Sequence, residues 1–277
     1  MRAASAKTPG SGAGPTLRSS IRYEVIDDST AYLDVDRWWG FSESEITAYV
    51  DSVFADIRSR GIETLIIDER GNGGENDRLA RPLLDYLTDA PYEYYGNEMR
   101  KLSPAYKRFF KRYSPQGWLI RQAPYNAAIK LLYHRHPTEP NTYVATKTGK
   151  EPKLRGKIKR NGPRFRGRAY LVTDGGTYSS AVSVADAFQH YGMGAVVGQA
   201  TGSAPNEHGE VMSLRLPNSG LVVTIPSVYY VRASGDEAAT DVVRPSIEVE
   251  IGALEEMGPA ELAAVVRAPR DDAPEAF

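Results

Sequence analysis

The chain has 277 residues, of which 41% are hydrophobic and 25% are charged, and these values are typical of a globular chain with a substantial core. It contains no cysteine, which excludes disulfides, thiolate catalysis and cysteine-based zinc sites. No apolar run approaches the roughly 18 residues of a membrane-spanning helix, so we expect no membrane span. The formal net charge is −1.

The charge is unevenly distributed along the chain. The segment 98–168 has 19 Lys and Arg residues against 3 Glu residues, so it is strongly basic and the remainder is acidic. Three interpretations stay open. The segment could be a solvent-exposed basic insertion, a lid that attracts anions such as the C-terminal carboxylate of a peptide, or a nucleic-acid-binding surface. No recognisable nucleic-acid module supports the third interpretation, so we expect no nucleic-acid partner.

The N-terminal region begins with residues 1–20, which are rich in Ala, Gly, Ser and Pro and which we expect to be a flexible leader. This leader has no apolar stretch of the kind found in secretion signals. Strands are predicted at Arg22–Ile26 and Ala31–Val35, on either side of a polar turn. A capping-box pattern at Ser42 then predicts a helix that runs to about Arg60 and ends at Gly61.

A glycine-rich loop follows the next predicted strand, Thr64–Ile67. The loop reads DERGNGG and leads into a predicted helix at about Asp77–Leu87, so ligands are expected at the carboxyl end of this strand. The loop has neither of the common phosphate-binding glycine patterns. A phosphate cradle, an ordinary tight turn and an oxyanion-hole loop therefore stay open as interpretations.

The basic segment contains two further predicted helices, Pro104–Arg112 and Ala123–His134. His134 and His136 are close enough in sequence to act as metal ligands, but no carboxylate cluster lies near them, which favours a pair of surface histidines. We expect neither a metal nor a cofactor. The predicted core comprises residues 21–97 and 169–268, interrupted by a basic insertion or lid at 98–168 and followed by a tail at 269–277.

The central unit of the predicted fold is the stretch from Tyr170 to Gly198. A strand at Ala169–Thr173 leads through a Gly-Gly turn to Ser179, a helix follows, and a second strand covers Ala195–Val197. Ser179 therefore lies at or just before a helix N-terminus, where free amides and the helix dipole favour a nucleophile and an oxyanion. The alternative is that Thr177, Ser179 and Ser180 are only N-cap residues.

The remaining elements are short. A loop is predicted at Gly198–Gly209 and a terminal helix at about Pro259–Arg267. Strands are predicted at Val211–Leu216 and Leu221–Ile225, which form a hairpin, and at Val228–Val231 and Ile247–Ile251.

Two motifs together resemble the tail-specific (C-terminal processing) family of serine peptidases, whose catalytic core is also found in tricorn protease and interphotoreceptor retinoid-binding protein. The first is LIIDERGNGG (Leu65–Gly74), and the second is YLVTDGGTYSSA followed by AVVG. The resemblance implies an α/β fold with a ClpP/crotonase-like core of stacked sheet and helices. It also implies a peptide or protein substrate and a periplasmic, secreted or cell-surface location.

The resemblance further implies site residues. Ser179 is the expected nucleophile of an acyl-enzyme mechanism. Its oxyanion hole is expected to use the amide of Ser180 and a glycine amide from the turn formed by Gly73 and Gly74. The chain departs from the family in three ways. The loop GQATGSAPNEHG contains no lysine where the processing proteases carry a catalytic lysine, and Pro245-Ser246-Ile247 stands where the family has P-D-I. The chain also begins without the N-terminal domain that supplies the histidine in tricorn-like relatives.

The general base is therefore open. His208, in the loop that borders the active site of the family, is the best base in this sequence, and Glu237 is a candidate to orient it. The alternative is a base on a missing N-terminal domain. Three functions follow: a serine peptidase, a non-catalytic peptide- or ligand-binding module on the same fold, or a crotonase-type enzyme acting on a thioester.

Overall fold

The computed structural model describes residues 16–100, 144–147, 158 and 160–268. These residues belong to two compact units: unit 1 comprises Met1–Tyr94, Glu151–Pro205 and Thr240–Phe277, and unit 2 comprises Tyr95–Lys150 and Asn206–Ala239. The predicted helices Pro104–Arg112 and Ala123–His134, together with His134 and His136, lie outside the described residues.

Unit 1 is an α/β structure built on a six-stranded sheet with the order β1-β2-β3-β6-β7-β10. β1 and β2 pair antiparallel, and the other neighbours pair in parallel. The α/β fold class is therefore confirmed. The strands are β1 (Ile21–Asp27), β2 (Thr30–Val35), β3 (Thr64–Asp68), β6 (Arg168–Thr173), β7 (Ala195–Gly198) and β10 (Ile247–Glu248).

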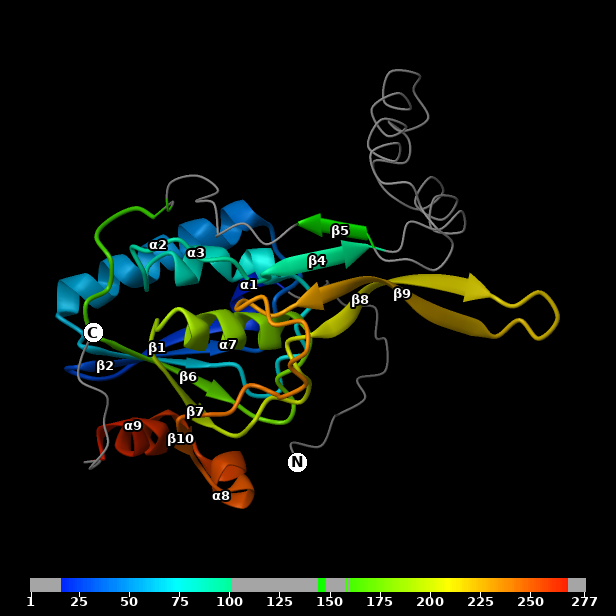
Figure 1. Ribbon diagram of the computed structural model, residues 1–277. Helices are drawn as coiled ribbons and strands as arrows, with labels where there is room; N and C mark the ends of the chain where they lie inside the picture. The colour runs from blue at the N-terminus through cyan, green and yellow to red at the C-terminus, as the bar shows by residue number, and fades with distance from the viewer. Residues whose placement is uncertain (1–15, 101–143, 148–157, 159, 269–277) are drawn as a thin grey trace. The chain divides into compact units, whose positions relative to one another are not determined.

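Helices cover both faces of this sheet (Figure 1). All five residues of β3 are buried, which is the pattern of a parallel strand covered on two sides. One face packs on α8 and α9 in a cluster that includes Tyr170, Leu254 and Leu262. The helices of unit 1 are α1 (Leu17–Ser20), α2 (Glu43–Arg60), the 3₁₀ turn η1 (Asp77–Leu79), α3 (Arg81–Leu84), α7 (Ser180–His190), α8 (Ile251–Glu256) and α9 (Pro259–Arg267).

Helix α2 has the start and the end that its sequence predicts. Ser42 accepts a hydrogen bond from the amide of Glu45 while the Glu45 side chain reaches back to Ser42, which is a complete capping box. Gly61 ends the helix in the left-handed conformation at φ 67°. The buried side of α2 consists of apolar residues at helical spacing, Ile46, Val50, Val53, Phe54 and Ile57.

Two predicted elements of unit 1 differ from the structure. The helix predicted at Asp77–Leu87 is only the short η1 and α3, because Pro82 cannot donate a backbone hydrogen bond and favours a helix start. The strand predicted at Ile247–Ile251 ends at Glu248, and α8 begins at Ile251.

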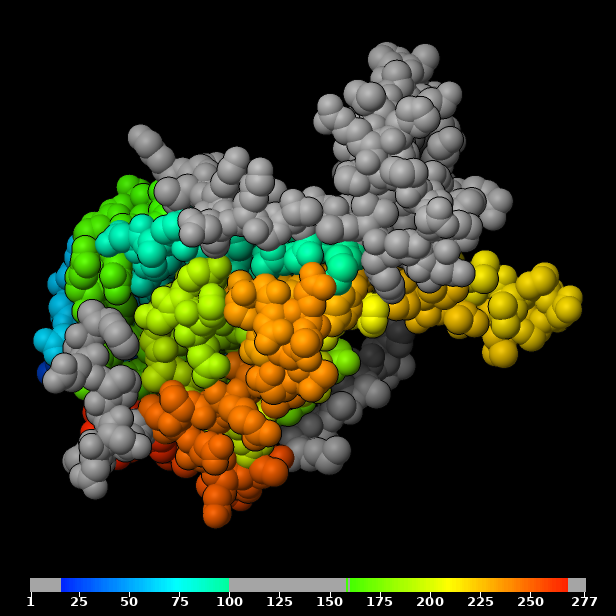
Figure 2. All heavy atoms as spheres, viewed as in Figure 1, coloured from blue at the N-terminus to red at the C-terminus, as the bar shows by residue number. Residues whose placement is uncertain are grey.

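Unit 2 contains a four-stranded antiparallel sheet with the order β5-β4-β9-β8. Its β8–β9 hairpin is long and narrow, and its atoms are the yellow ones in Figure 2. The two strands predicted at Leu221–Ile225 and Val228–Val231 are one continuous strand. Pro226 is tolerated within it because β4 pairs only with Val228–Val231, so β9 has a single neighbour at the proline. The strands are β4 (Asn97–Arg100), β5 (Val144–Lys147), β8 (Glu207–Arg215) and β9 (Val222–Val231).

Candidate active site

The candidate nucleophile loop lies at the carboxyl end of β6. Ser179 ends this loop with φ 52° and ψ −126°, a backbone conformation that is strained for a residue with a side chain. The next residue, Ser180, begins α7. Although Ser179 occupies the N-cap position, its side chain makes no capping hydrogen bond. A strained strand-to-helix turn that presents a serine hydroxyl is the geometry of a nucleophile elbow.

The glycine-rich loop is held against this candidate nucleophile loop by hydrogen bonds to its backbone carbonyls. The amide of Tyr178 donates to the carbonyl of Asn72 at 2.9 Å, and the hydroxyl of Thr177 donates to the carbonyl of Glu69 at 2.9 Å. Asn72 is fully buried, and its side-chain amide donates to the carbonyl of Val35 at 3.0 Å. The two motifs that the sequence singles out therefore form one connected structure.

Asp174 provides a second connection between the two loops. Its Oδ1 accepts hydrogen bonds from the amides of Gly176 and Thr177 within the nucleophile loop, at 2.8 Å and 3.0 Å. The same oxygen accepts from the amide of Gly71 in the glycine-rich loop at 2.9 Å. One carboxylate oxygen thus fixes the separation of the two loops.

Gly74 makes the closest approach between the loops. A Cβ atom at Gly74 would lie 2.6 Å from the amide nitrogen of Ser180 and 2.6 Å from the carbonyl oxygen of Tyr178. Its φ of +89° also favours glycine. The turn therefore packs against the first amide of α7, and that amide has no intrahelical acceptor because it lies in the first turn.

The two glycines of the turn differ in burial and in hydrogen bonding. The amide of Gly74 donates to the side-chain oxygen of Asn72 at 2.9 Å, and Gly74 is buried. Gly73 is exposed, and a Cβ atom there would meet no other atom within 4 Å. Gly74 is therefore fixed by its surroundings, whereas Gly73 lies at the surface of the turn.

A buried carboxyl group, which the sequence analysis missed, lies beneath the glycine-rich loop. Glu69 and Trp38 are both 0% exposed, and the indole Nε1 of Trp38 donates to Oε1 of Glu69 at 2.7 Å. Burial is the main cause that raises the pKa of Glu69 to about 8, and the nearby Asp68 carboxylate adds to the increase. The backbone amide of Trp38 also donates to the carbonyl of Gly74 at 3.3 Å, so this pair supports the turn.

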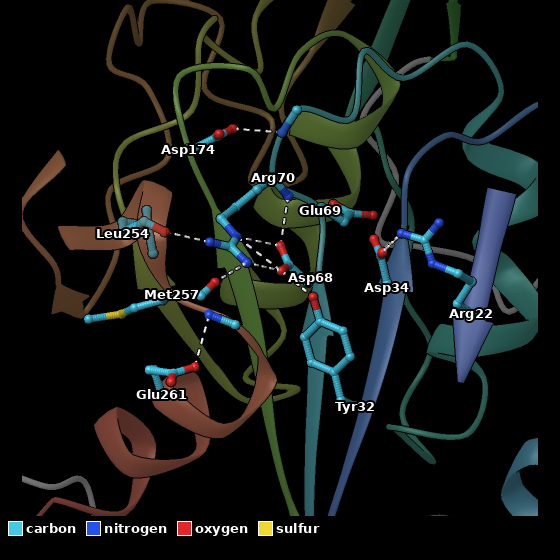
Figure 3. A network of polar contacts seen from close by, with 12 residues as sticks. Arg22, Tyr32, Asp34, Asp68, Glu69, Arg70, Asp174, Leu254, Met257 and Glu261 are labelled. Atoms are coloured by element: carbon cyan, nitrogen blue, oxygen red, sulfur yellow. Dashed lines mark hydrogen bonds and ion pairs between the residues drawn. The ribbon is translucent and has the colours of Figure 1, made fainter. Parts of the chain in front are cut away.

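Arg70 of the D-x-R-x-N-x-G motif connects the loop to the C-terminal helices (Figure 3). Its guanidinium pairs with Asp68 at 2.6 Å and donates to the carbonyls of Leu254, at 2.5 Å, and Met257, at 3.1 Å. Tyr32 donates to Asp68 at 2.6 Å, and burial together with the Asp68 charge raises the pKa of Tyr32. Each of the three guanidinium nitrogens donates to a protein acceptor, which indicates a structural role for Arg70.

The two candidates for the base and its orienting acid lie in unit 2. His208 was expected in a loop, but it is the second residue of β8, where it pairs with Tyr229 and the two rings lie 4.8 Å apart. Glu237 accepts a hydrogen bond from the side chain of Asn97 at 3.0 Å. Their pairing with Ser179 stays a prediction.

The described part of the chain contains no cluster of three or more metal-ligating side chains. Among the same residues, no helix has both the length and the apolar character that crossing a membrane requires.

Comparison with known proteins gives a family match. The model of the family described as Peptidase family S41 matches residues 29–249. No curated protein sequence matches the chain.

Solved structures with a similar fold include mature CPAF complexed with lactacystin, with 16% identity, a TM-score of 0.55, and coverage of 79% of this chain and 47% of that one. A putative peptidase from Parabacteroides merdae has 16% identity and a TM-score of 0.51, with coverage of 94% and 63%. The photosystem II D1 C-terminal processing protease has 15% identity and a TM-score of 0.48, with coverage of 93% and 54%. The chain thus spans about half to two thirds of these proteins.

Proposed function

The chain belongs to peptidase family S41, and from this membership we propose that it is a serine-type peptide hydrolase with Ser179 as its nucleophile. The observation that carries the proposal is the backbone of Ser179, which is held at φ 52° directly before α7 with its hydroxyl unused as a cap. Strain of this kind persists only where the surrounding structure enforces it, and it is concentrated at functional sites. Here the enforcement comes from the hydrogen bonds that tie the two loops together.

The proposed reaction is acyl transfer through an ester intermediate. Oγ of Ser179 attacks the scissile carbonyl carbon while its proton moves to the base. The resulting oxyanion accepts hydrogen bonds from the amide of Ser180 and from the glycine turn. The base then returns the proton to the leaving amine, the C–N bond breaks, and water hydrolyses the acyl-enzyme.

The second oxyanion donor is proposed to come from Gly73. The amide of Gly74 already donates to Asn72, whereas Gly73 is exposed at the turn. Gly74 serves in this proposal as the close contact that seats the turn on α7. An oxyanion donor of this type is worth about 3–4 kcal/mol of transition-state stabilisation.

His208 is proposed as the general base and Glu237 as the acid that orients it. An imidazole has an ordinary pKa of about 6.5 and suits proton transfer near neutral pH. The alternative is a general base that is supplied by a domain outside this sequence. His190, at the C-terminal end of α7, is a matched control because it is eleven residues along the chain from Ser179. Loss of peptidase activity in His208→Gln with retention in His190→Gln supports His208, whereas equal retention refutes it.

The tail-specific subtype, and with it a preference for substrates with a free C-terminus, belongs to the same proposal. We infer a peptide or protein substrate from the family. The basic segment 98–168 would favour the carboxylate of a C-terminus. Cleavage of a peptide with a free C-terminus, compared with the same peptide amidated at its C-terminus, tests this preference.

The missing lysine motivates a second candidate function. No lysine occurs from residue 198 to residue 209, so a non-catalytic peptide- or ligand-binding module is the alternative. Fluorophosphonate labelling separates the two functions. The wild-type chain and Ser180→Ala should both be labelled, because an alanine keeps the backbone amide, and Ser179→Ala should not be. Absence of labelling in the folded wild-type chain would favour the binding module.

A further inference from the structure

A cavity lies in unit 1 at the amino-terminal end of β6, whereas Ser179 follows the carboxyl end of the same strand. Its volume is about 700 Å³, within the range of small-molecule sites. Its walls come from the end of α2 and from the segment leading into β6. Both are on the left in Figure 1, the end of α2 in light blue and the segment before β6 in green. Arg168 begins β6 and the nucleophile loop follows the end of the same strand, so this cavity is separate from the candidate active site.

The floor of the cavity is apolar and rigid. Phe54, Ile57 and Phe165 line it, and all three are buried. Phe54 stacks on Tyr86 with ring centroids 4.1 Å apart and meets the edge of Phe165 at 6.1 Å. This aromatic packing fixes the surface on which a ligand would lie.

The rim of the cavity is cationic. Four arginines and one glutamate line it, so its formal charge is strongly positive: Arg58, Glu63, Arg164, Arg166 and Arg168.

Among the described residues, one of these four arginines forms an ion pair. Arg166 pairs with Asp89 at 3.2 Å. Within the part of the chain that the structure describes, Arg58, Arg164 and Arg168 form no ion pair. The Nε atom of Arg164 is buried and lacks a hydrogen-bond partner among these residues. The positive charge of the rim is therefore neutralised within the described residues only at Arg166, and an anion in the cavity would neutralise more of it.

We propose that this cavity binds a small amphipathic anion, in which a carboxylate or phosphate group is attached to an aryl or alkyl portion. The planar guanidinium groups match both oxyanions with paired hydrogen bonds. The apolar portion of the ligand covers Phe54 and Phe165. The cationic rim of the cavity thus binds the oxyanion of the ligand, and the apolar floor binds its aryl or alkyl portion.

Isothermal titration calorimetry of the full chain tests the proposal with two probes, 4-phenylbutyrate and phenyl phosphate. Each has a control that lacks one half of the ligand: the neutral 4-phenylbutanamide, and inorganic phosphate. At least one of the two amphipathic anions should bind saturably with one site, at least about tenfold more tightly than its own control. The probe that binds tighter identifies the preferred oxyanion.

Variants locate the binding. Arg58→Gln and Arg168→Gln should each weaken binding of the preferred anion by at least about tenfold, which is the scale of one lost charge-assisted hydrogen bond. Arg60→Gln is the matched control, because Arg60 lies in the same last turn of α2 but does not line the cavity. Both arginines to be replaced are exposed, so the variants should fold, and their melting temperatures check this.

Three results would overturn the proposal. The first is the absence of saturable binding of both anions. The second is equal affinity for each anion and its control. The third is unchanged affinity in Arg58→Gln and Arg168→Gln while both variants remain folded. None of these results depends on whether Ser179 is a nucleophile.

Discussion

Trp38 donates its indole N–H to the carboxyl group of Glu69 over 2.7 Å, and both side chains are fully buried. Oε2 of Glu69 has no hydrogen-bond partner within the described residues. Since a buried carboxylate with a single donor is poorly stabilised, the neutral acid is favoured in the folded state. The loop that carries Gly73 and Gly74 therefore rests on a group whose charge depends on pH.

This arrangement predicts that the chain loses stability as pH rises. The pKa of Glu69 is raised from 4.5 to about 8, so the folded state holds a proton that the unfolded state releases. The proton on Glu69 makes its full contribution to the free energy of unfolding below pH 4.5. Above that pH the contribution declines by up to about 1.4 kcal/mol per pH unit, and it is lost once the pH passes about 8. Urea unfolding from pH 5 to pH 9 should show this decline in the wild type and a flatter profile in Glu69→Gln. Equal pH profiles would show that Glu69 does not hold the proton.

Gly74 and Gly73 form a matched pair for a second prediction. Gly74→Ala places a methyl group 2.6 Å from the backbone of Ser180 and Tyr178, in a left-handed conformation. We expect it to lower the free energy of unfolding by about 2 kcal/mol or more and to slow fluorophosphonate labelling of Ser179 at least about tenfold. Gly73→Ala meets no atom within 4 Å and should leave stability nearly unchanged. Equal effects of the two substitutions on stability would contradict the packing described for this turn.

The strained backbone of Ser179 gives a third prediction. Both Ser179→Gly and Ser179→Ala remove the hydroxyl and should abolish labelling. Only glycine accepts φ 52° and ψ −126° without steric cost, so Ser179→Gly should be more stable than Ser179→Ala by about 1 kcal/mol. Thermal unfolding of the two inactive variants measures this difference. An alanine variant that is as stable as the glycine variant would mean that position 179 carries no strain.

Asp174 gives a fourth prediction, because it connects the two loops. Asp174→Ala leaves the amides of Gly71, Gly176 and Thr177 without their shared acceptor and should cost about 1–3 kcal/mol of stability. Labelling of Ser179 should also slow as the loops separate. Asp28→Ala, at an exposed turn position, is the control for loss of a carboxylate. If the two variants are equally stable and equally labelled, Asp174 does not hold the loops together.

Much of the fold could be predicted because its signals are local. The capping box at Ser42 and the glycine at 61 define α2, and the continuous apolar run at Thr64–Ile67 defines the buried strand β3. The two errors in unit 2 arose where a neighbouring strand decides the outcome. His208 lies in a strand rather than a loop because β9 pairs with it, and Pro226 is accepted within β9 because β4 does not reach it.

The candidate site could be predicted only in part. Ser179 and the glycine turn follow from motifs that are contiguous in sequence. The Glu69–Trp38 pair was missed, because the two residues are far apart in sequence and no local pattern predicts that they meet. The signal available was a second acid directly after a buried strand, with a tryptophan pair preceding α2. The anchoring of three amides by Asp174 depends on loop geometry that no local pattern specifies.

The strand order of the sheet also has a consequence for biosynthesis. β3 pairs with β6, which begins about a hundred residues later at Arg168, and β7 pairs with β10, which consists of Ile247 and Glu248 near the end of the described chain. During translation, β3 therefore leaves the ribosome long before its partner β6 is synthesised. Such long-range parallel pairing is slow and exposes intermediates to aggregation. The chain is accordingly expected to refold slowly after dilution from denaturant and to gain yield when a chaperone shields that early strand.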